Sequence, residues 1–175
     1  MSKNNNNIIE DGGLIPVQER YPHDVTGSHD YNQDDLMYRD ASSGQVWPLD
    51  TDAHAATFVG VAAKPGFIAP YTATQLPGGP AMSKQYDTDA LIQRDCIVGF
   101  FGHTGETYHD GDLVYLDSSA DPQTVCNTPG NAQGGAGAHP VGIVKLPSAS
   151  IGTAVAYAAG VRIPVRIIAQ FPIAS

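Results

Sequence analysis

The amino-acid sequence predicts an all-β protein, a small barrel or sandwich in which one strand unit occurs twice. Glycine and proline together supply 32 of the 175 residues (19 + 13), so the chain has many turns. Charged residues make up only 15%, below the roughly 25% of an average globular protein, which disfavours long exposed helices. The third observation is an internal repeat, which divides most of the chain into two similar halves.

The repeat joins "DDLMYRDASS", which begins at Asp34, with "GDLVYLDSSA", which begins at Gly111. Six identical pairs share one offset of 77 positions (108 − 31). In each copy the spacing of apolar side chains predicts a β-strand, and the Asp and Ser residues that follow predict a turn. The second copy is apolar on both faces, which indicates a more buried strand. The pairs are Tyr31 and Tyr108, Asp35 and Asp112, Leu36 and Leu113, Tyr38 and Tyr115, Asp40 and Asp117, and Ser42 and Ser119.

A second shared element follows each copy, "FVGVAAKP" in the first half and "PVGIVKLP" in the second. Gly60 and Gly142 occupy the same place within it, at an offset of 82 (142 − 60), so about five residues are inserted in the second half. A glycine inside a strand marks a bulge or a close approach of another backbone. We therefore expect Tyr38 and Tyr115, and likewise Gly60 and Gly142, to hold equivalent positions in the fold.

The third element is a β-branched or aromatic run that ends each half, "DCIVGFFG" (95–102) and "VRIPVRIIAQF" (161–171). The stretch 83–95 is the one candidate for helix, with Ser83 as an N-cap, and little other helix is expected. The resulting β-domain and its two pseudo-repeats span residues 26–175, about 26–102 and about 103–175.

Residues 1–25 are expected to form an extended N-terminal arm. The segment begins with an asparagine run and a glycine pair, neither of which can build a core. Pro16 and Pro22 resist helix and leave an extended segment that lies on another surface. Such an arm is loose without a partner surface; the alternative is an edge strand on the chain's own barrel. Its apolar candidates for contact are Ile8, Ile9, Leu14, Ile15 and Val17.

Charge and the lack of targeting signals narrow the choice of partners. The net charge of −9 at pH 7 repels phosphate backbones, so no nucleic acid is expected. We find no signal-peptide run in the first 13 residues and no apolar stretch of transmembrane length, so no membrane partner is expected. The chain is then made in a reducing cytoplasm, where Cys96 and Cys126 are expected to be small buried thiols, although their even number leaves a disulfide open.

The sequence contains no arrangement that points strongly to catalysis. His103 and His109 flank "TGETY" without a zinc-ligand spacing, so we interpret them as exposed turn residues. The aspartates of "DTD" (50–52 and 87–89) and "DGD" (110–112) are interpreted as turn residues, with calcium binding left open. The sequence has no nucleophile elbow, phosphate loop or dinucleotide fingerprint. We therefore expect no catalytic residue, no metal ligand and no cofactor.

The repeated motifs resemble those of the head-decoration proteins of tailed bacteriophages, which stabilise the capsid. The resemblance rests on "YHDGDLVYLDSSA", "HPVGIVK" and "AYAAGVRIPVRI", in that order. The first half carries it more loosely, as "YNQDDLMYRD", "ATFVGVAAKPG" and "DCIVGFFG". In that family a "GD-apolar-V" strand precedes an "A-x-VG-apolar-A" segment and a "G-x-apolar-x-V" strand. The resemblance covers roughly residues 31–175.

The resemblance implies a non-enzymatic structural protein with a β-tulip-like barrel, located on the capsid exterior of the virion after synthesis in the host cytoplasm. Its partner would be the major capsid protein, contacted through the arm, and the chain would form a homo-oligomer, with a trimer favoured. The shortest members of the family have one such unit and this chain has two, which leaves its symmetry open. The alternatives are another structural phage protein, such as a tail-tube, fibre or adhesive component, and a carbohydrate-active β-domain.

Overall fold

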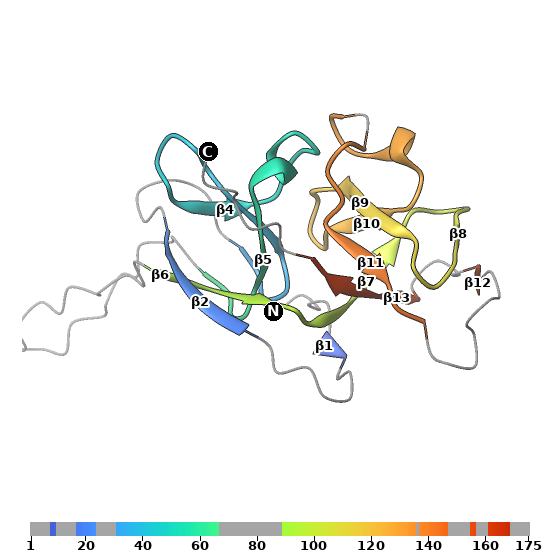
Figure 1. Cartoon of the computed structure of the whole chain (residues 1–175), viewed down its shortest axis with the longest axis horizontal. Coiled ribbons are helices and arrows are strands. Elements are labelled where there is room, and N and C mark those ends of the chain that lie inside the picture. The colour runs from blue at the N-terminus through green and yellow to red at the C-terminus, as the bar shows by residue number, and fades with distance from the viewer. Residues whose placement is uncertain are drawn as a thin grey trace, which may run out of the picture.

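The computed structural model of the chain is all-β, as the sequence predicted, and describes residues 8–9, 17–23, 31–66, 89–135, 137–146, 155–156 and 161–168 (Figure 1). The helical segments among these residues are two short 3-10 helices, η1 (His54–Thr57) and η2 (Pro129–Asn131). No helix in the described part of the chain is long and apolar enough to cross a bilayer. The strands are β1 (Ile8–Ile9), β2 (Val17–Pro22), β3 (Leu36–Arg39), β4 (Val46–Pro48), β5 (Phe58–Ala62), β6 (Asp89–Arg94), β7 (Ile97–Gly102), β8 (Thr107–Tyr108), β9 (Leu113–Ser118), β10 (Thr124–Cys126), β11 (Gly142–Val144), β12 (Val155–Ala156) and β13 (Arg162–Ile167).

The second half of the chain forms a closed five-stranded barrel, which we call the second unit. Its strand order is β7-β10-β9-β11-β13, and β13 pairs back onto β7 to close the ring. All neighbours are antiparallel except β10 and β7, which are parallel. Closure pairs both edges of each strand, so the barrel has little exposed strand edge of its own. A separate two-stranded ribbon, β8 with β12, lies beside the barrel.

The first half of the chain forms a curled five-stranded sheet of order β2-β6-β5-β3-β4, which we call the first unit. All four of these pairings are antiparallel. Directly after β2, His23 makes a parallel bridge with Val46 of β4, so the two outer strands of the sheet meet. Figure 1 shows β2, β4, β5 and β6 on the left and the second unit on the right.

The two units have the same strand order and the same register. Strands β2, β3, β4, β5 and β6 correspond to β7, β9, β10, β11 and β13. Where β3 meets β5, Met37 pairs with Gly60, and where β9 meets β11, Val114 pairs with Gly142. Met37 and Val114 are 77 positions apart, which is the offset of the sequence repeat. The structure therefore places Gly60 and Gly142 at one equivalent position.

The same correspondence holds on the other side of β3 and β9. Tyr38 pairs with Trp47, and Tyr115 pairs with Cys126, so the two tyrosines also occupy equivalent strand positions. The parallel contact that joins the outer strands is repeated as well. In the first unit it joins His23 to Val46, and in the second unit it joins Gly102 to Val125.

The boundary between the halves differs from the one that the sequence predicted. The run 95–102 was expected to end the first half, but β7 is the first strand of the second unit. The counterpart of β13 is β6, not β7, because β6 and β13 pair with β5 and β11 in the same register. Asp95, with a φ of 53°, turns the chain from β6 into β7, so the chain passes from one unit to the other through Asp95 and Cys96 alone. The first unit therefore spans residues 17–94 and the second spans residues 97–167.

The predicted arm over residues 1–25 also needs correction. Residues 17–22 form β2, which pairs with β6 along its whole length, and His23 is buried. This pairing makes β2 a strand of the first unit. Ile8 and Ile9 form β1, which pairs with Val98 and Ile97 of β7. Leu14 and Ile15 lie outside the described residues.

The repeated glycines are explained by a close approach of backbones. A side chain at Gly60 would lie 2.5 Å from the carbonyl oxygen of Gln93, and one at Gly142 would lie 2.7 Å from that of Arg166. Gln93 and Arg166 are equivalent residues of β6 and β13, so the same contact occurs twice. Gly60 also has a φ of 138°, which disfavours any other residue.

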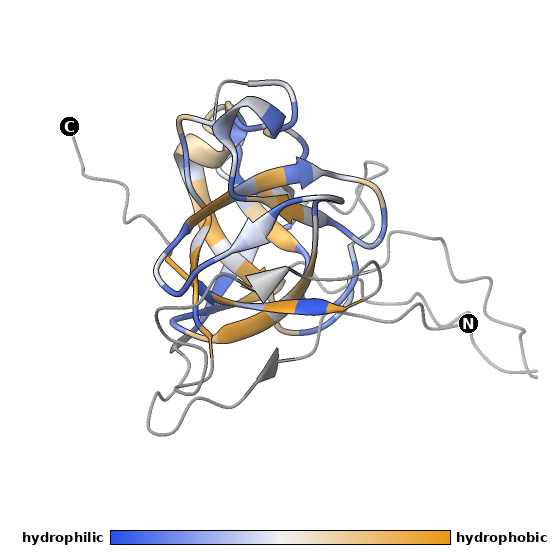
Figure 2. Cartoon of the chain, turned by 90° about the vertical axis from the view of Figure 1, so that its right-hand side faces the viewer, coloured by the Kyte–Doolittle hydropathy of each residue, from blue (hydrophilic) through white to orange (hydrophobic). Residues whose placement is uncertain are grey.

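One continuous hydrophobic core joins the two units. Figure 2 shows hydrophobic residues along the strands and hydrophilic ones in many of the turns around them. A smaller cluster lies within the first unit, around Met37, Val46 and Ile92. The shared core includes Leu36, Leu49, Phe58 and Val61 of the first unit and Val98, Phe100, Val114, Leu116, Val125, Val144, Ile163 and Val165 of the second.

The candidate helix at 83–95 is a strand where the structure describes it. Residues 89–94 form β6, which is bonded to β2 on one side and to β5 on the other. Ala90 and Ile92 are fully buried on one face, which is the period of two that a strand requires. Two neighbouring strands therefore override the helix propensity of Ala90 and Leu91.

Candidate functional site

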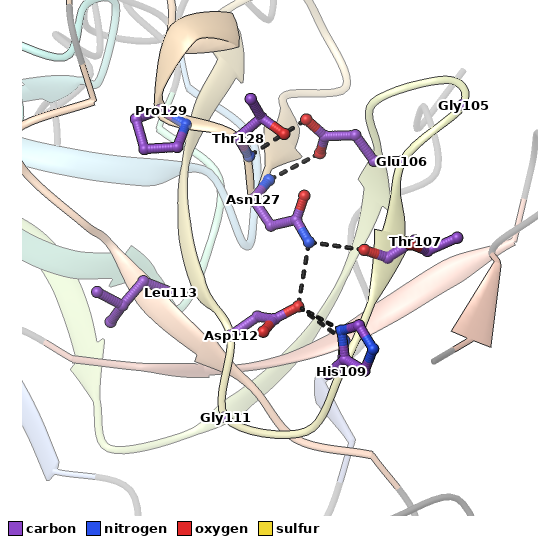
Figure 3. Close-up of a pocket in the computed structure, with 10 residues that line it drawn as sticks. All are labelled: Gly105, Glu106, Thr107, His109, Gly111, Asp112, Leu113, Asn127, Thr128 and Pro129. Carbon is purple, nitrogen blue, oxygen red and sulfur yellow. Dashed lines mark hydrogen bonds and ion pairs between the residues drawn. The ribbon is translucent and has the colours of Figure 1, made fainter. Parts of the chain in front are cut away.

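The candidate site is a surface hollow of about 730 Å³ at the end of the second unit, beside β8 and the start of β9 (Figure 3). Two chain segments form its two walls. The first wall is the loop that leads through β8 into β9, and the second is the segment that follows β10. The lining residues are Gly105, Glu106, Thr107, His109, Gly111, Asp112, Leu113, Asn127, Thr128 and Pro129.

The first wall is shaped by two glycines and one aspartate. Gly105 and Gly111 have φ values of 90° and 93°, which glycine adopts without strain. The backbone N–H of Gly111 donates to the carbonyl of Val144 (2.9 Å), and the backbone N–H of His109 donates to Oδ2 of Asp112 (2.7 Å). The "DGD" sequence therefore makes a tight turn that sets the direction of β9.

Glu106 ties the two walls together. Its Oε2 accepts hydrogen bonds from the backbone N–H of Asn127 (2.7 Å) and the hydroxyl of Tyr108 (2.9 Å). Its Oε1 accepts from the backbone N–H of Thr128 (3.2 Å) and from Nδ2 of Asn131 (2.8 Å). Burial alone would raise the pKa of Glu106, but these donors outweigh it and hold the pKa below its usual value.

Asn127 continues the network toward the turn. Its Nδ2 donates to the carbonyl of Thr107 (2.7 Å) and to Oδ2 of Asp112 (3.1 Å). In Figure 3 the dashed lines run from Glu106 through Asn127 to Asp112 and His109, while Leu113 stands apart from them. The carboxylates of Glu106 and Asp112 both accept hydrogen bonds from donors of the chain itself. These bonds hold the two walls of the hollow in place. Leu113, with 45% of its surface exposed, is a large apolar residue at the hollow.

The two histidines that flank "TGETY" each contact a different carboxylate. Nδ1 of His103 is 2.8 Å from Oδ1 of Asp117, and Nδ1 of His109 is 3.5 Å from Oδ2 of Asp112. The two aspartates of "DGD" also have different partners. Asp112 lies near His109, whereas Asp110 accepts a hydrogen bond from the backbone N–H of Leu146 (2.8 Å). Among the described residues, no group of three or more His, Cys, Asp or Glu side chains is placed to hold a metal ion.

The two cysteines are buried free thiols and are not joined. Cys96 lies between β6 and β7, whereas Cys126 ends β10 and packs with Tyr115 and Ala132. Burial raises the pKa of each thiol to about 12, so both remain protonated at neutral pH.

Of the residues that the sequence singled out, His109 and Asp112 meet in the hollow, whereas the repeated tyrosines and glycines lie elsewhere. Tyr38 lies in the first unit, with its ring stacked on His54 at 4.5 Å, and Tyr115 lies in the second. The contacts that form the site, Glu106 to Asn127 and Asn127 to Asp112, join residues 15 to 21 positions apart. "TGETY" and "DGD" were visible as turns, but nothing in the local sequence of Asn127 indicates its role.

Neither a family model nor a curated protein matches the chain.

Proposed function

We propose that the chain is a non-enzymatic structural protein that binds the outside of a phage capsid and stabilises the shell. The observation that carries the proposal is the place of the motifs that resemble decoration proteins. In the second unit they contain β9, β11 and β13, which are neighbours in one barrel. In the first unit "YNQDDLMYRD" and "ATFVGVAAKPG" contain β3 and β5, which pair in the register of β9 and β11.

We also infer that the two units arose by duplication of one strand unit. The inference is supported by the equal strand order and by the same approach of a carbonyl to Gly60 and to Gly142. A duplicated unit gives one chain two similar bodies, which suits a shell that offers many similar binding places.

The body is well suited to a mechanical role because charged side chains fix its loops. Asp52 of the first unit accepts hydrogen bonds from the backbone N–H groups of Ala138 (3.0 Å) and His139 (3.3 Å) of the second. Asp40 accepts from the hydroxyls of Ser42 (2.5 Å) and Ser43 (2.7 Å) in the β3–β4 turn. Hydrogen bonds to carboxylates are among the stronger ones, so these loops present a constant surface to a partner.

The capsid contact is assigned to the segment before β2, residues 1–16. Within this shortened arm Leu14 and Ile15 stay as contact residues. Ile8 and Ile9 pair with β7 of the chain's own barrel and Val17 begins β2, so these three leave the set. Several arms on one oligomer would bind cooperatively through their effective concentration, even if each binds weakly.

The test is co-sedimentation of the purified protein with expanded capsids assembled from the major capsid protein of the same phage without this chain. The full chain should bind, and a chain that lacks residues 1–16, and with them the β1–β7 pairing, should stay folded but fail to sediment with the particles. A full-length chain that stays in the supernatant would refute decoration. Full occupancy by the shortened chain would refute the role of the arm.

A further inference from the structure

We propose that the hollow around Leu113 is the docking site for a second copy of this chain, whose β3–β4 turn (residues 40–45) enters it head to tail. The proposal rests on a comparison of equivalent corners of the two units. It is independent of capsid binding, because the interface joins copies of the chain in solution. Its test therefore uses the purified protein alone.

In the first unit the corner is occupied by the second unit. Leu36 and Leu49 are fully buried there, and Gln123 reaches them from the turn between β9 and β10. Oε1 of Gln123 accepts from the backbone N–H of Leu36 (2.6 Å), and its Nε2 donates to the carbonyl of Leu49 (2.8 Å). Gln123 is itself only 3% exposed. This corner is therefore part of the built junction between the units.

In the second unit the equivalent corner is open. Leu113 corresponds to Leu36, because Leu36 pairs with Val61 and Leu113 pairs with Ile143. Leu36 is 0% exposed, whereas Leu113 is 45% exposed. Ile143 is partly exposed, although its counterpart Val61 is fully buried. One and the same sheet corner is thus covered in the first unit and uncovered in the second.

The backbone N–H and C=O groups of the open corner point in the same directions as those of the covered corner. The carbonyl of Asp112 accepts from the N–H of Val144 in β11 (2.8 Å), and the carbonyl of Val114 accepts from the N–H of Val141, just before β11 (2.9 Å). Residues alternate along an antiparallel pair, so the N–H and C=O of Leu113 point to the opposite edge of β9, beside the hollow. In the first unit those two groups of Leu36 are the ones that meet Gln123 and Leu49.

The occupant follows from the same correspondence. The β9–β10 turn (residues 119–123) covers the first corner, and its counterpart in the first unit is the β3–β4 turn. Ala41, Ser42 and Ser43 at the tip of that turn are exposed. In Figure 1, β4 lies at the left-hand end of the molecule and β8, next to the hollow, lies at the right-hand end. A turn at one end and a hollow at the other match copies that add head to tail.

The β3–β4 turn carries charges of both signs, since it begins at the carboxylate of Asp40 beside the cation of Arg39. The exposed Arg39 side chain lies against the β3–β4 turn, where its Nε donates to the carbonyl of Gly44 (3.2 Å). The hollow carries the carboxylates of Glu106 and Asp112. An arriving turn would bring Asp40 together with Arg39 toward these carboxylates, so charge does not select the orientation, which follows from the equivalence of the two corners.

A head-to-tail contact uses two different surfaces of each copy, so successive contacts close into a ring or continue as a filament. In a ring of three copies, six similar units would alternate between contacts within a chain and contacts between chains. Each chain would then contribute one corner covered by itself and one covered by its neighbour.

The experiment measures the mass of the purified protein by sedimentation velocity over a range of concentrations. The wild-type chain should associate, and Leu113→Glu should shift the weight-average mass to the 18.4 kDa of a single chain. Val161→Glu is the matched control, since Val161 is a large apolar residue that is 49% exposed outside the hollow. Equal melting temperatures of the variants establish that Leu113→Glu has not merely unfolded the barrel.

A mixing experiment separates head-to-tail contact from other modes. Ala41→Glu blocks the turn and leaves the hollow intact, so this variant alone should also be monomeric. A mixture of Leu113→Glu and Ala41→Glu restores one good turn and one good hollow, and should yield particles of two chains that grow no further. A monomeric wild type, an unchanged mass for Leu113→Glu, dissociation by Val161→Glu, or a mixture that stays monomeric would each overturn the proposal.

Discussion

Replacement of Gly142 by alanine tests whether the repeated glycine is required by the approach of β13. The added methyl group would lie 2.7 Å from the carbonyl oxygen of Arg166 and against Cγ1 of Val165. Ordinary contact begins near 3.4 Å, so the two strands must separate by about 0.7 Å (3.4 − 2.7). Overpacking of this kind costs about 1–3 kcal/mol, so we expect Gly142→Ala to lower the free energy of unfolding by that amount.

Two further glycines bracket the effect. Gly60→Ala meets the same kind of carbonyl at 2.5 Å and also places alanine at a φ of 138°, so it should destabilise more than Gly142→Ala. Gly130 is exposed and an added methyl group there meets nothing within 4 Å. Gly130→Ala should therefore be neutral, or stabilise by about 0.4–1 kcal/mol through the unfolded state.

Thermal unfolding followed by circular dichroism, with urea titration at one temperature, measures these differences. For a chain of this size about 1 kcal/mol shifts the melting temperature by roughly 2–4 °C, so Gly142→Ala should melt about 2–12 °C below the wild type. A Gly142→Ala protein that melts with the wild type, or with Gly130→Ala, would show that β11 and β13 do not approach as described.

Three other perturbations test the junction and the hollow. Burial raises the pKa of Asp34 from 3.8 to about 7, and this effect is larger than the lowering by Arg162. Between these two pH values the folded chain keeps a proton on Asp34 that the unfolded chain has released. The free energy of unfolding should therefore fall as pH rises from about 4 to about 7. Asp34→Asn should lessen that fall in melting temperature, and an unchanged pH profile would argue against a buried carboxyl. Gln123→Leu leaves the N–H of Leu36 without its acceptor and should cost about 1–3 kcal/mol in urea titration, whereas Gln18→Leu on the exposed side of β2 should change little. Glu106→Gln should lower the melting temperature at neutral pH, and the difference from wild type should vanish as pH falls through the lowered pKa of Glu106; a pH-independent difference would contradict the assigned charge.

The sequence predicted the strands that belong to the internal repeat. It missed the strands that form only because they pair with residues far away in the chain. β3 and β9, with β5 and β11, follow directly from the two offsets of the repeat. β4 and β10 have only three residues each, too few for a pattern to appear, and β10 joins β7 in parallel. The sequence of β2 is "VQERYP", and its polar residues and proline do not indicate a strand. The strand becomes evident only through its pairing with β6.

The candidate site was predictable only in part, for the same physical reason. The turn at 110–112 is local, and its Asp-Gly sequence predicted it. The links from Glu106 to Asn127 and from Gln123 to Leu36 span 21 and 87 positions, and no local pattern encodes such contacts. The difference in exposure between Leu36 and Leu113 is also invisible in the sequence, because the two residues are identical and only the packing of the units distinguishes them.

The passage of the chain from β6 to β7 through Asp95 and Cys96 has a consequence for how the protein folds. A two-residue connection allows neither unit to move away from the other, and one core runs through both. The first unit, made alone, would expose Leu36, Leu49, Phe58 and Val61 to water, which favours aggregation. The two units should therefore melt together in a single cooperative transition, and a gene cut at Asp95 should give two insoluble products rather than two small domains.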